Sequence, residues 1–241
     1  MSGCDLDPVN SDAEMKVRVV SHSSKPFQNR LQAGLLLAQE LADLHGKKSV
    51  VLGIPRGGIV VAKSLAQEIG ADLDITISRK LGAPGQSELA IGALAENGDI
   101  FLNQNVLDEL SVADSYIEQE KERQIEEIKR RSQLIRGVLP KVPLAGRLVV
   151  LTDDGVATGA TMQAAVWAIR REKPQKLIVA IPVASEEAVS NLARDVDELI
   201  CLRMPANFYA VGQFYLQFSQ ITDEEVLEIL KLEQIRRTRK R

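Results

Sequence analysis

Short apolar, β-branched stretches alternate with segments of helical periodicity along most of the chain. The strand-like stretches are residues 49–54, 72–78, 147–152, 176–181 and 199–203. Apolar residues recur at helical spacing in residues 27–44, 57–70, 159–172, 185–194 and 223–235. Strands that alternate with helices indicate a mainly parallel sheet covered on both faces. We therefore predict a doubly wound α/β fold, in which ligands bind at the carboxyl ends of the strands.

Three segments fall outside this alternation. Residues 1–25 begin with a polar, acidic stretch and are expected to form a flexible N-terminal arm. Residues 79–99 are expected to be rich in loops, since glycine and proline interrupt every pattern there. Residues 104–138 are heavily charged with a thin apolar stripe, which predicts a long helical insertion. This helix either packs on one side with its other face solvated, or binds a partner such as a second copy in a homodimer.

The expected organisation is one α/β domain over residues 26–221, which contains the insertion, followed by a C-terminal helix and basic tail over 222–241. Asp223 can cap that helix. The tail, RRTRKR, is expected to be solvated, because the rest of the chain supplies no matching basic patch for nucleic acid.

Composition excludes several classes of function. The net charge of −3 over 241 residues argues against general attraction to nucleic acid. No stretch approaches the about 18 apolar residues of a membrane span. Cys4 and Cys201 lie far apart, which favours free thiols in a reducing cytoplasm. With only two histidines, His22 and His45, a histidine-based triad or metal site is poorly supported.

The stretch LVVLTDDGVATGATM, residues 148–162, carries the clearest chemical signal. A buried strand ends in Asp153 and Asp154, and a loop of small residues then opens a helix. Small residues let backbone N–H groups approach a ligand, and a helix N-terminus attracts anions, so the loop suits a phosphate. The two carboxylates suit hydroxyl groups or a metal beside it. A sugar phosphate meets both demands, whereas the alternative is an ordinary turn with aspartate as a helix cap.

Competing motifs fail on inspection. Ala160 stands where a Walker lysine would follow Gly159, and the sequence holds neither GxGxxG nor GxSxG. The DLD at residues 72–74 resembles a phosphatase motif but precedes its strand instead of following it.

The segment VVLTDDGVATGAT resembles the diphosphoribose-binding motif of type I phosphoribosyltransferases, although Thr152 and Gly155 replace the usual aliphatic residues. GIPRGG, residues 53–58, resembles the family's pyrophosphate loop. SRKLGAPG, residues 78–85, is similar to the Arg-Lys pair and flexible loop of the adenine and orotate enzymes. The three motifs follow the family's order. The resemblance covers roughly residues 27–205 and is nearest to uncharacterised predicted phosphoribosyltransferases.

The resemblance implies phosphoribosyl pyrophosphate and Mg²⁺ as ligands, and a hood over the site. Asp153 and Asp154 would hold the ribose hydroxyls and would contact the metal indirectly, mainly through substrate and water. The pyrophosphate would be bound by Arg56, Gly57 and Gly58 and neutralised by Arg79 and Lys80. The family often has a cis peptide in this loop, here between Pro55 and Arg56. The 5′-phosphate would lie on a loop of seven residues: Gly155, Val156, Ala157, Thr158, Gly159, Ala160 and Thr161.

The nitrogen acceptor is less defined. Hypoxanthine-guanine enzymes have an aspartate where this chain has Ala157, so the resemblance disfavours a 6-oxopurine. Glu88 could assist an adenine-like reaction, or it could be a solvated loop acid. The hood is either the 101–146 segment or the 204–218 segment, whose Phe208, Tyr209, Phe214 and Tyr215 could stack on a base or pack on the sheet. The chain is expected to be a transferase, and the alternative is a phosphoribosyl-pyrophosphate-binding regulator with little turnover.

Overall fold

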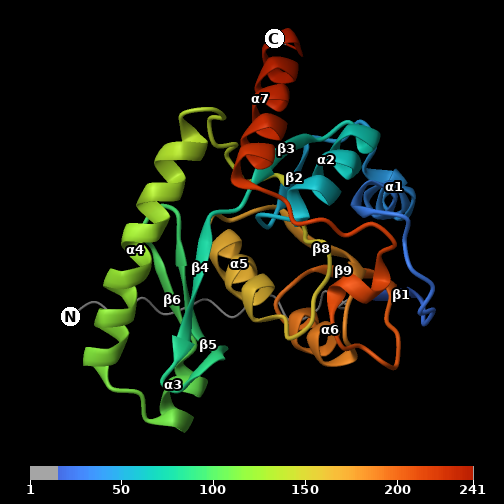
Figure 1. Ribbon diagram of the computed structural model, residues 1–241. Helices are drawn as coiled ribbons and strands as arrows, with labels where there is room; N and C mark the ends of the chain where they lie inside the picture. The colour runs from blue at the N-terminus through green and yellow to red at the C-terminus, as the bar shows by residue number, and fades with distance from the viewer. Residues whose placement is uncertain (1–15, 241) are drawn as a thin grey trace.

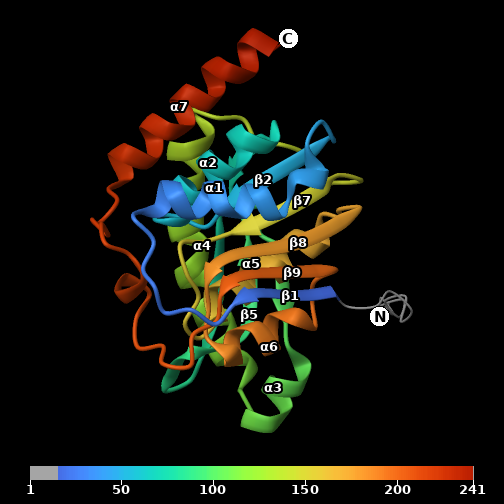
Figure 2. The same cartoon turned by 90° about the vertical axis from the view of Figure 1, so that its right-hand side faces the viewer.

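A six-stranded parallel sheet forms the centre of the computed structural model, which describes residues 16–240 (Figure 1). Its order is β1-β9-β8-β7-β2-β3, and Figure 2 shows the run from β1 to β2 side by side. The strands are β1 (Lys16–Ser21), β9 (Glu198–Arg203), β8 (Lys176–Val183), β7 (Leu148–Thr152), β2 (Ser49–Gly53) and β3 (Asp72–Ile75). The predicted doubly wound parallel sheet is thus confirmed.

Helices cover both faces of this sheet. Helices α1 (Arg30–Glu40) and α2 (Gly58–Ile69) pack on one face, while α5 (Ala160–Arg171) and α6 (Glu186–Ala193) pack on the other. Val50 and Val51 are neighbours in β2, yet they belong to opposite cores because side chains alternate along a strand. Burial on both faces explains the continuous apolar runs in the sequence.

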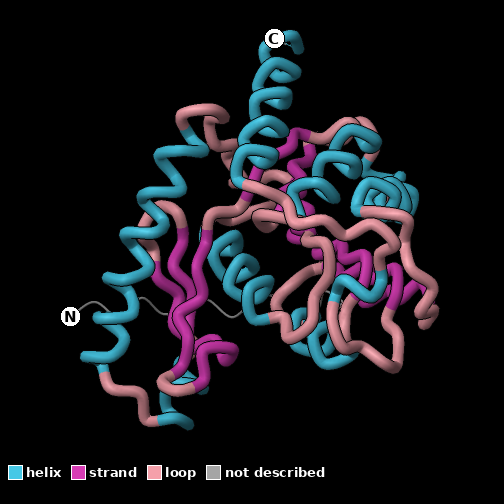
Figure 3. The backbone as a smooth tube through the Cα atoms, in the orientation of Figure 1, coloured by secondary structure: helices cyan, strands magenta, loops and turns pink. Residues whose placement is uncertain are grey.

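A second, antiparallel sheet replaces the loops expected over residues 79–99. It consists of β4 (Ser78–Ala83), β5 (Gln86–Ala95) and β6 (Ile100–Leu102). In Figure 3 its strands lie between α4 and the rest of the molecule. The small residues that suggested a loop are instead explained by the close packing of β5 against its neighbours. A Cβ on Gly92 would overlap the carbonyl of Phe101, and Ala93 and Ala95 are buried. Glycine therefore marks a close backbone approach here and not a break in the strand.

The helical insertion consists of α3 (Gln104–Leu110) and α4 (Asp114–Arg136), and α4 runs along the antiparallel sheet (Figure 1). Its thin apolar stripe is buried at Ile117, Ile128 and Ile135, while its outer charges are exposed. The helix thus packs on one side, in agreement with the first of the two expectations; a homodimer stays a prediction.

Two terminal expectations need correction. Residues 16–21 belong to no arm: they form edge strand β1, in register with β9 from Lys16–Glu198 to Ser21–Arg203. The strand gives little signal in the sequence because an edge strand is only half covered, which leaves Val17 and Val20 exposed. Residues 1–15, including Cys4, lie outside the described residues. At the other end, α7 (Asp223–Lys240) extends through most of the basic tail.

The first arginines of that tail are not freely solvated. Arg236 donates to the carbonyl of Ala71 at 2.6 Å, and Arg237 donates to that of Leu73. Both also pair with Glu233, which is buried. These contacts dock α7 beside β3. Within residues 16–240, no helix is both long enough and apolar enough to cross a membrane.

Candidate active site

The acid pair lies at the carboxyl end of β7, in the middle of the sheet, as the sequence predicts. Gly53 of β2 pairs with Thr152, so the loop after β2 lies directly beside Asp153 and Asp154. The backbone N–H of Asp154 donates to Asp153 Oδ1 at 2.8 Å. Burial raises the pKa of Asp153 well above its ordinary value, and the neighbouring charge of Asp154 raises it further. Burial also raises the pKa of Asp154, although Arg30 opposes that rise.

Arg30 is a site residue that sequence reasoning missed. Its Nε donates to Asp154 Oδ2 at 2.7 Å, and its side chain is only 9% exposed. Its Nη1 donates to the carbonyl of Ser219 at 2.8 Å, and its guanidinium lies 3.9 Å from the centre of the Phe218 ring. Arg30 thus joins the start of α1, the acid pair and the C-terminal segment. Sequence spacing carries no signal for a pair of residues so far apart in the chain.

The 53–58 loop lies against the acid pair and contains the expected cis peptide bond. The Pro55–Arg56 peptide bond is cis. Gly57 and Gly58 lie against the acids so closely that no larger residue fits: a Cβ on Gly57 would overlap Asp154 Oδ2, and one on Gly58 would lie 2.7 Å from Asp153 Oδ1. The glycines therefore allow the loop and the carboxylates to share one small space. The side chain of Arg56 is exposed.

The 155–161 loop opens α5 as expected. Gly159 has a φ of +84°, which favours glycine, and α5 begins at Ala160. Ala157 and Thr158 are exposed, and the loop is fixed on its other side because Ser185 Oγ donates to the Ala157 carbonyl at 2.6 Å. A loop with exposed small residues at a helix N-terminus is a suitable anion site.

The Arg-Lys pair of β4 lies at a cavity of about 240 Å³ beside these loops. Pro55 and Thr161 line this cavity together with Arg79 and Lys80. The structure thus brings the three motifs together, although the acid pair and Arg56 are not part of the cavity wall. Glu88 lies in β5, but its side chain is outside the described part, so its role stays a prediction.

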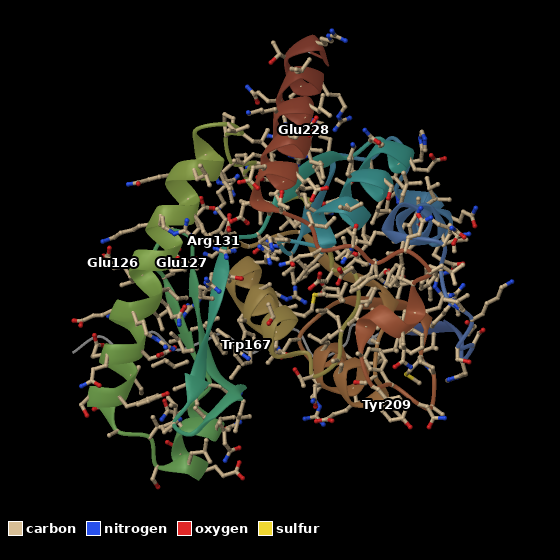
Figure 4. The ribbon with its side chains drawn as sticks, in the orientation of Figure 1. Glu126, Glu127, Arg131, Trp167, Tyr209 and Glu228 are labelled. Atoms are coloured by element: carbon tan, nitrogen blue, oxygen red, sulfur yellow. The ribbon has the colours of Figure 1, made fainter. Side chains whose placement is uncertain are left out.

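The aromatic 204–218 segment packs mainly as core. Phe214 and Tyr215 are buried, and the Tyr215 hydroxyl donates to the Asp154 carbonyl at 2.6 Å. The Phe208 ring lies 5.1 Å from that of Phe214. Tyr209 alone among the four is strongly exposed, at 85%, and it projects from the surface in Figure 4. The segment is therefore anchored to the acid pair, and of the four rings Tyr209 is the most accessible for stacking.

A model of the phosphoribosyl transferase domain matches residues 28–219, which include all three motifs and Arg30. The chain belongs to this family of transferases. A Mycobacterium tuberculosis H37Rv protein named "Putative phosphoribosyl transferase Rv0571c" is 42% identical over 206 residues, which are 86% of this chain and 46% of that protein. The same values hold for the protein of strain CDC 1551, so the chain spans about half the length of these curated relatives.

A solved relative has the same fold over almost its full length. The crystal structure of TT1426 from Thermus thermophilus is 46% identical, with a TM-score of 0.80. The alignment covers 86% of this chain and 98% of that one. The family resemblance drawn from the three motifs is thereby confirmed, whereas the role of each site residue stays a prediction.

Proposed function

We propose that this domain transfers a phosphoribosyl group from phosphoribosyl pyrophosphate to a nitrogen acceptor and releases pyrophosphate. The observation that supports it most is the half-buried acid pair packed against Gly57 and Gly58, followed by a loop of small residues at the start of α5. A ribose with phosphoryl groups at both ends matches this order of groups. In the reaction, the bond from C1 to pyrophosphate breaks with its electrons on pyrophosphate, the acceptor nitrogen bonds to C1, and that nitrogen loses a proton.

Each motif has a distinct task in this proposal. Asp153 and Asp154 accept hydrogen bonds from the ribose hydroxyls and favour the positive charge that develops on the ring. Gly155 to Thr161 hold the 5′-phosphate. Arg79 and Lys80 offset the negative charge on the departing pyrophosphate.

Mg²⁺ fits this donor set. No three of the described His, Cys, Asp and Glu side chains gather into a metal cluster, but the acid pair offers carboxylate oxygens. Mg²⁺ is commonly held by one or two carboxylates together with substrate phosphates and water. Asp153 and Asp154 would hold it mainly through ligand oxygens and water, and the metal would supply charge neutralisation at the pyrophosphate.

Cations at the cavity favour a transferase over a ligand-sensing regulator. A regulator needs affinity for the sugar phosphate but has no need to stabilise a leaving group. Arg79 and Lys80 line the cavity beside Pro55, where a leaving pyrophosphate would lie. Turnover is therefore the better explanation of these residues.

Ala157 argues against 6-oxopurines as acceptors. Its side chain offers no polar contact where hypoxanthine-guanine enzymes have an aspartate. Sites that hydrogen-bond a substrate group discriminate by about 10⁴-fold or more, whereas shape alone gives about 10–200-fold. Hypoxanthine and guanine should therefore be poor acceptors. Pyrophosphate release with adenine, hypoxanthine, guanine, orotate and simple amines tests this, and efficient hypoxanthine turnover would overturn it.

Ligand binding can be tested without knowing the acceptor. Phosphoribosyl pyrophosphate with Mg²⁺ should bind in titration calorimetry, and Asp153→Asn with Asp154→Asn should weaken it by roughly tenfold or more per carboxylate, since hydrogen bonds to charged groups contribute about 1.5–3 kcal/mol. Asp43→Asn, at an exposed carboxylate on the surface, is the control. Equal affinity in the double variant and the wild type would contradict the assignment of the acids.

A further inference from the structure

One wall of the cavity comes from α4, which none of the three motifs includes. This helix contributes Tyr116, Glu120, Arg123, Gln124, Arg131 and Ile135 to the lining. In Figure 4, Glu127 and Arg131 lie on the side of α4 toward the antiparallel sheet, and Glu126 lies on the opposite side. The helical insertion therefore presents a polar, partly charged face to the same space as Pro55 and Thr161.

Two arginines from different elements meet on one carboxylate at this wall. Glu127 Oε1 accepts from Arg79 at 2.9 Å and from Arg131 at 2.7 Å. Arg130 also donates to Glu127, but it points to solvent with a side chain 60% exposed and does not line the cavity. These hydrogen bonds, first from Arg130 and then from Arg131, lower the pKa of Glu127 to about 2. Glu127 is thus an ionised partner that holds Arg79 and Arg131 at the edge of the cavity.

Positive charge dominates the lining. The lining includes four cations, Arg79, Lys80, Arg123 and Arg131, and one carboxylate, Glu120. Glu127 contacts Arg79 and Arg131 without lining the cavity itself. Glu120 is itself neutralised, because Arg123 donates to it at 2.7 Å. Thr76, Ser78 and Thr161 add hydroxyl groups to the wall. Guanidinium groups bind phosphoryl oxygens in a bidentate geometry, and hydroxyls donate to the remaining oxygens.

We propose that α4 completes the pyrophosphate end of the substrate site, with Arg131 binding phosphoryl oxygens together with Arg79. This rests on the proposed function and adds to it a binding residue from the helical insertion. The ligand class is a multiply charged phosphoryl anion, because Pro55 of the 53–58 loop lines the cavity and the wall carries four cationic side chains together with hydroxyl groups. Glu127 keeps the two arginines in place before the ligand arrives, so that little side-chain ordering remains to be done on binding.

Two simple ligands separate the halves of the site. Inorganic pyrophosphate with Mg²⁺ probes the α4 side, and ribose 5-phosphate probes the acid pair and the 155–161 loop. In titration calorimetry, Arg131→Gln should weaken pyrophosphate binding by about tenfold or more. The affinity for ribose 5-phosphate should stay within about twofold of the wild-type value. Arg130→Gln is the matched control, since it removes the same charge and the same Glu127 contact one residue earlier; it should change neither affinity by more than about twofold.

Each result decides between the proposals. If the wild type binds neither phosphoribosyl pyrophosphate nor pyrophosphate, the proposed function fails. If it binds both, and Arg131→Gln behaves like Arg130→Gln, the inference about α4 alone is wrong. Equal weakening of both probes would mean that Arg131 acts through the fold, which also overturns it. Should Arg131→Gln unfold, Arg131→Lys keeps the charge without the bidentate geometry, and it should bind pyrophosphate several-fold more weakly with ribose 5-phosphate unchanged.

Discussion

The fold disfavours a negative charge on Asp153, because burial and the neighbouring charge of Asp154 both raise its pKa. Asp153 lies beside a second carboxylate, and Gly57 and Gly58 pack closely against the two acids. Arg30 reaches only its neighbour, at Asp154 Oδ2. The two acids are therefore unequal: Asp154 has a fixed cationic partner, whereas Asp153 accepts hydrogen bonds from backbone N–H groups. Such a residue is expected at a site for hydroxyl groups or a metal, where the ligand supplies the missing partner.

This inequality predicts how stability depends on pH. The pKa of Asp153 is raised in the folded state, so the folded chain binds a proton more readily than the unfolded chain does. Its ionisation therefore destabilises the fold as the pH rises through and above the unfolded value of 3.8. Asp153→Asn removes that penalty and keeps an oxygen for the Asp154 N–H. The variant should be more stable than the wild type at pH 7, with an unfolding temperature higher by about 2–4 °C for each kcal/mol gained.

The gain should shrink on acidification and vanish below about pH 3–4, where the aspartate is protonated in both states. Thermal unfolding in buffers from pH 3 to 8 measures it, with Asp43→Asn as the exposed control. A variant that is less stable than the wild type at pH 7 would show that the ionised form of Asp153 is favoured by the fold.

At the scale of elements, Arg136 connects three parts of the structure. At the end of α4, it donates to Asp74 of β3 and to Glu96 after β5, each at 2.7 Å. Asp74 is 1% exposed and also accepts from the Val142 N–H at 2.8 Å. One guanidinium thus fixes both the antiparallel sheet and α4 against the central sheet, and with them the far wall of the cavity.

Removal of this guanidinium should be costly. Arg136→Gln leaves two enclosed carboxylates without their cation, and breaking a buried ion pair costs about 3–5 kcal/mol. Arg123→Gln, at a side chain that is 72% exposed, should have a much smaller effect, because water screens an exposed guanidinium. Chemical denaturation of the two variants measures the difference. An equal loss of unfolding free energy in both variants would show that Arg136 does not connect these elements.

The Arg136 effect should also depend on pH. Burial raises the pKa of Glu96, but the hydrogen bond and charge of Arg136, with help from Ser132, outweigh burial and lower it below 4.5. Glu96 therefore stabilises the wild type above the unfolded pKa of 4.5, and that contribution is lost as the pH falls through the folded pKa. The difference in the free energy of unfolding between the wild type and Arg136→Gln should therefore narrow below about pH 4.5.

A helix or strand could be predicted from the sequence where the pattern of neighbouring residues alone determines it. The strand from Leu148 to Thr152 and the loop after it are set by burial on both faces and by small residues at a helix start. The β4–β5 hairpin was not predictable in this way, because its glycines have three different roles. Gly82 lies at a bulge, Gly85 forms a turn with φ of +71°, and Gly92 allows close contact with β6. Composition alone does not distinguish these uses of glycine from a loop.

At the scale of the whole molecule, the candidate site is assembled from distant parts of the chain. Arg30 comes from α1, Gly57 from the β2–α2 loop, Asp154 from the end of β7, and Tyr215 from the C-terminal segment. The three local motifs were visible in the sequence, but the contacts of Arg30 and Tyr215 were not. Long-range contacts depend on how elements pack, and no spacing rule within a single sequence reports them.

Ligand binding should therefore stabilise the whole fold. A ligand that binds only the folded state adds about 2.7 kcal/mol at a hundred times its Kd. For a chain of this size, this should raise the unfolding temperature by roughly 5–11 °C. Phosphoribosyl pyrophosphate with Mg²⁺ should give this rise in the wild type and a clearly smaller one in the Asp153→Asn, Asp154→Asn variant at the same ligand concentration. Equal rises would place the ligand elsewhere.

The pairing of β1 with β9 also has a consequence for synthesis on the ribosome. Of the described strands, β1 is translated first, and its partner β9 is translated last. Until Arg203 has left the exit tunnel, the N–H and C=O groups of β1 have no strand of their own chain to pair with. An unpaired strand is a template for pairing with other chains, and a contact between distant segments forms slowly. The nascent chain therefore exposes an unpaired strand for most of its translation. Strand β1 takes its place only after the other strands of the sheet have been synthesised.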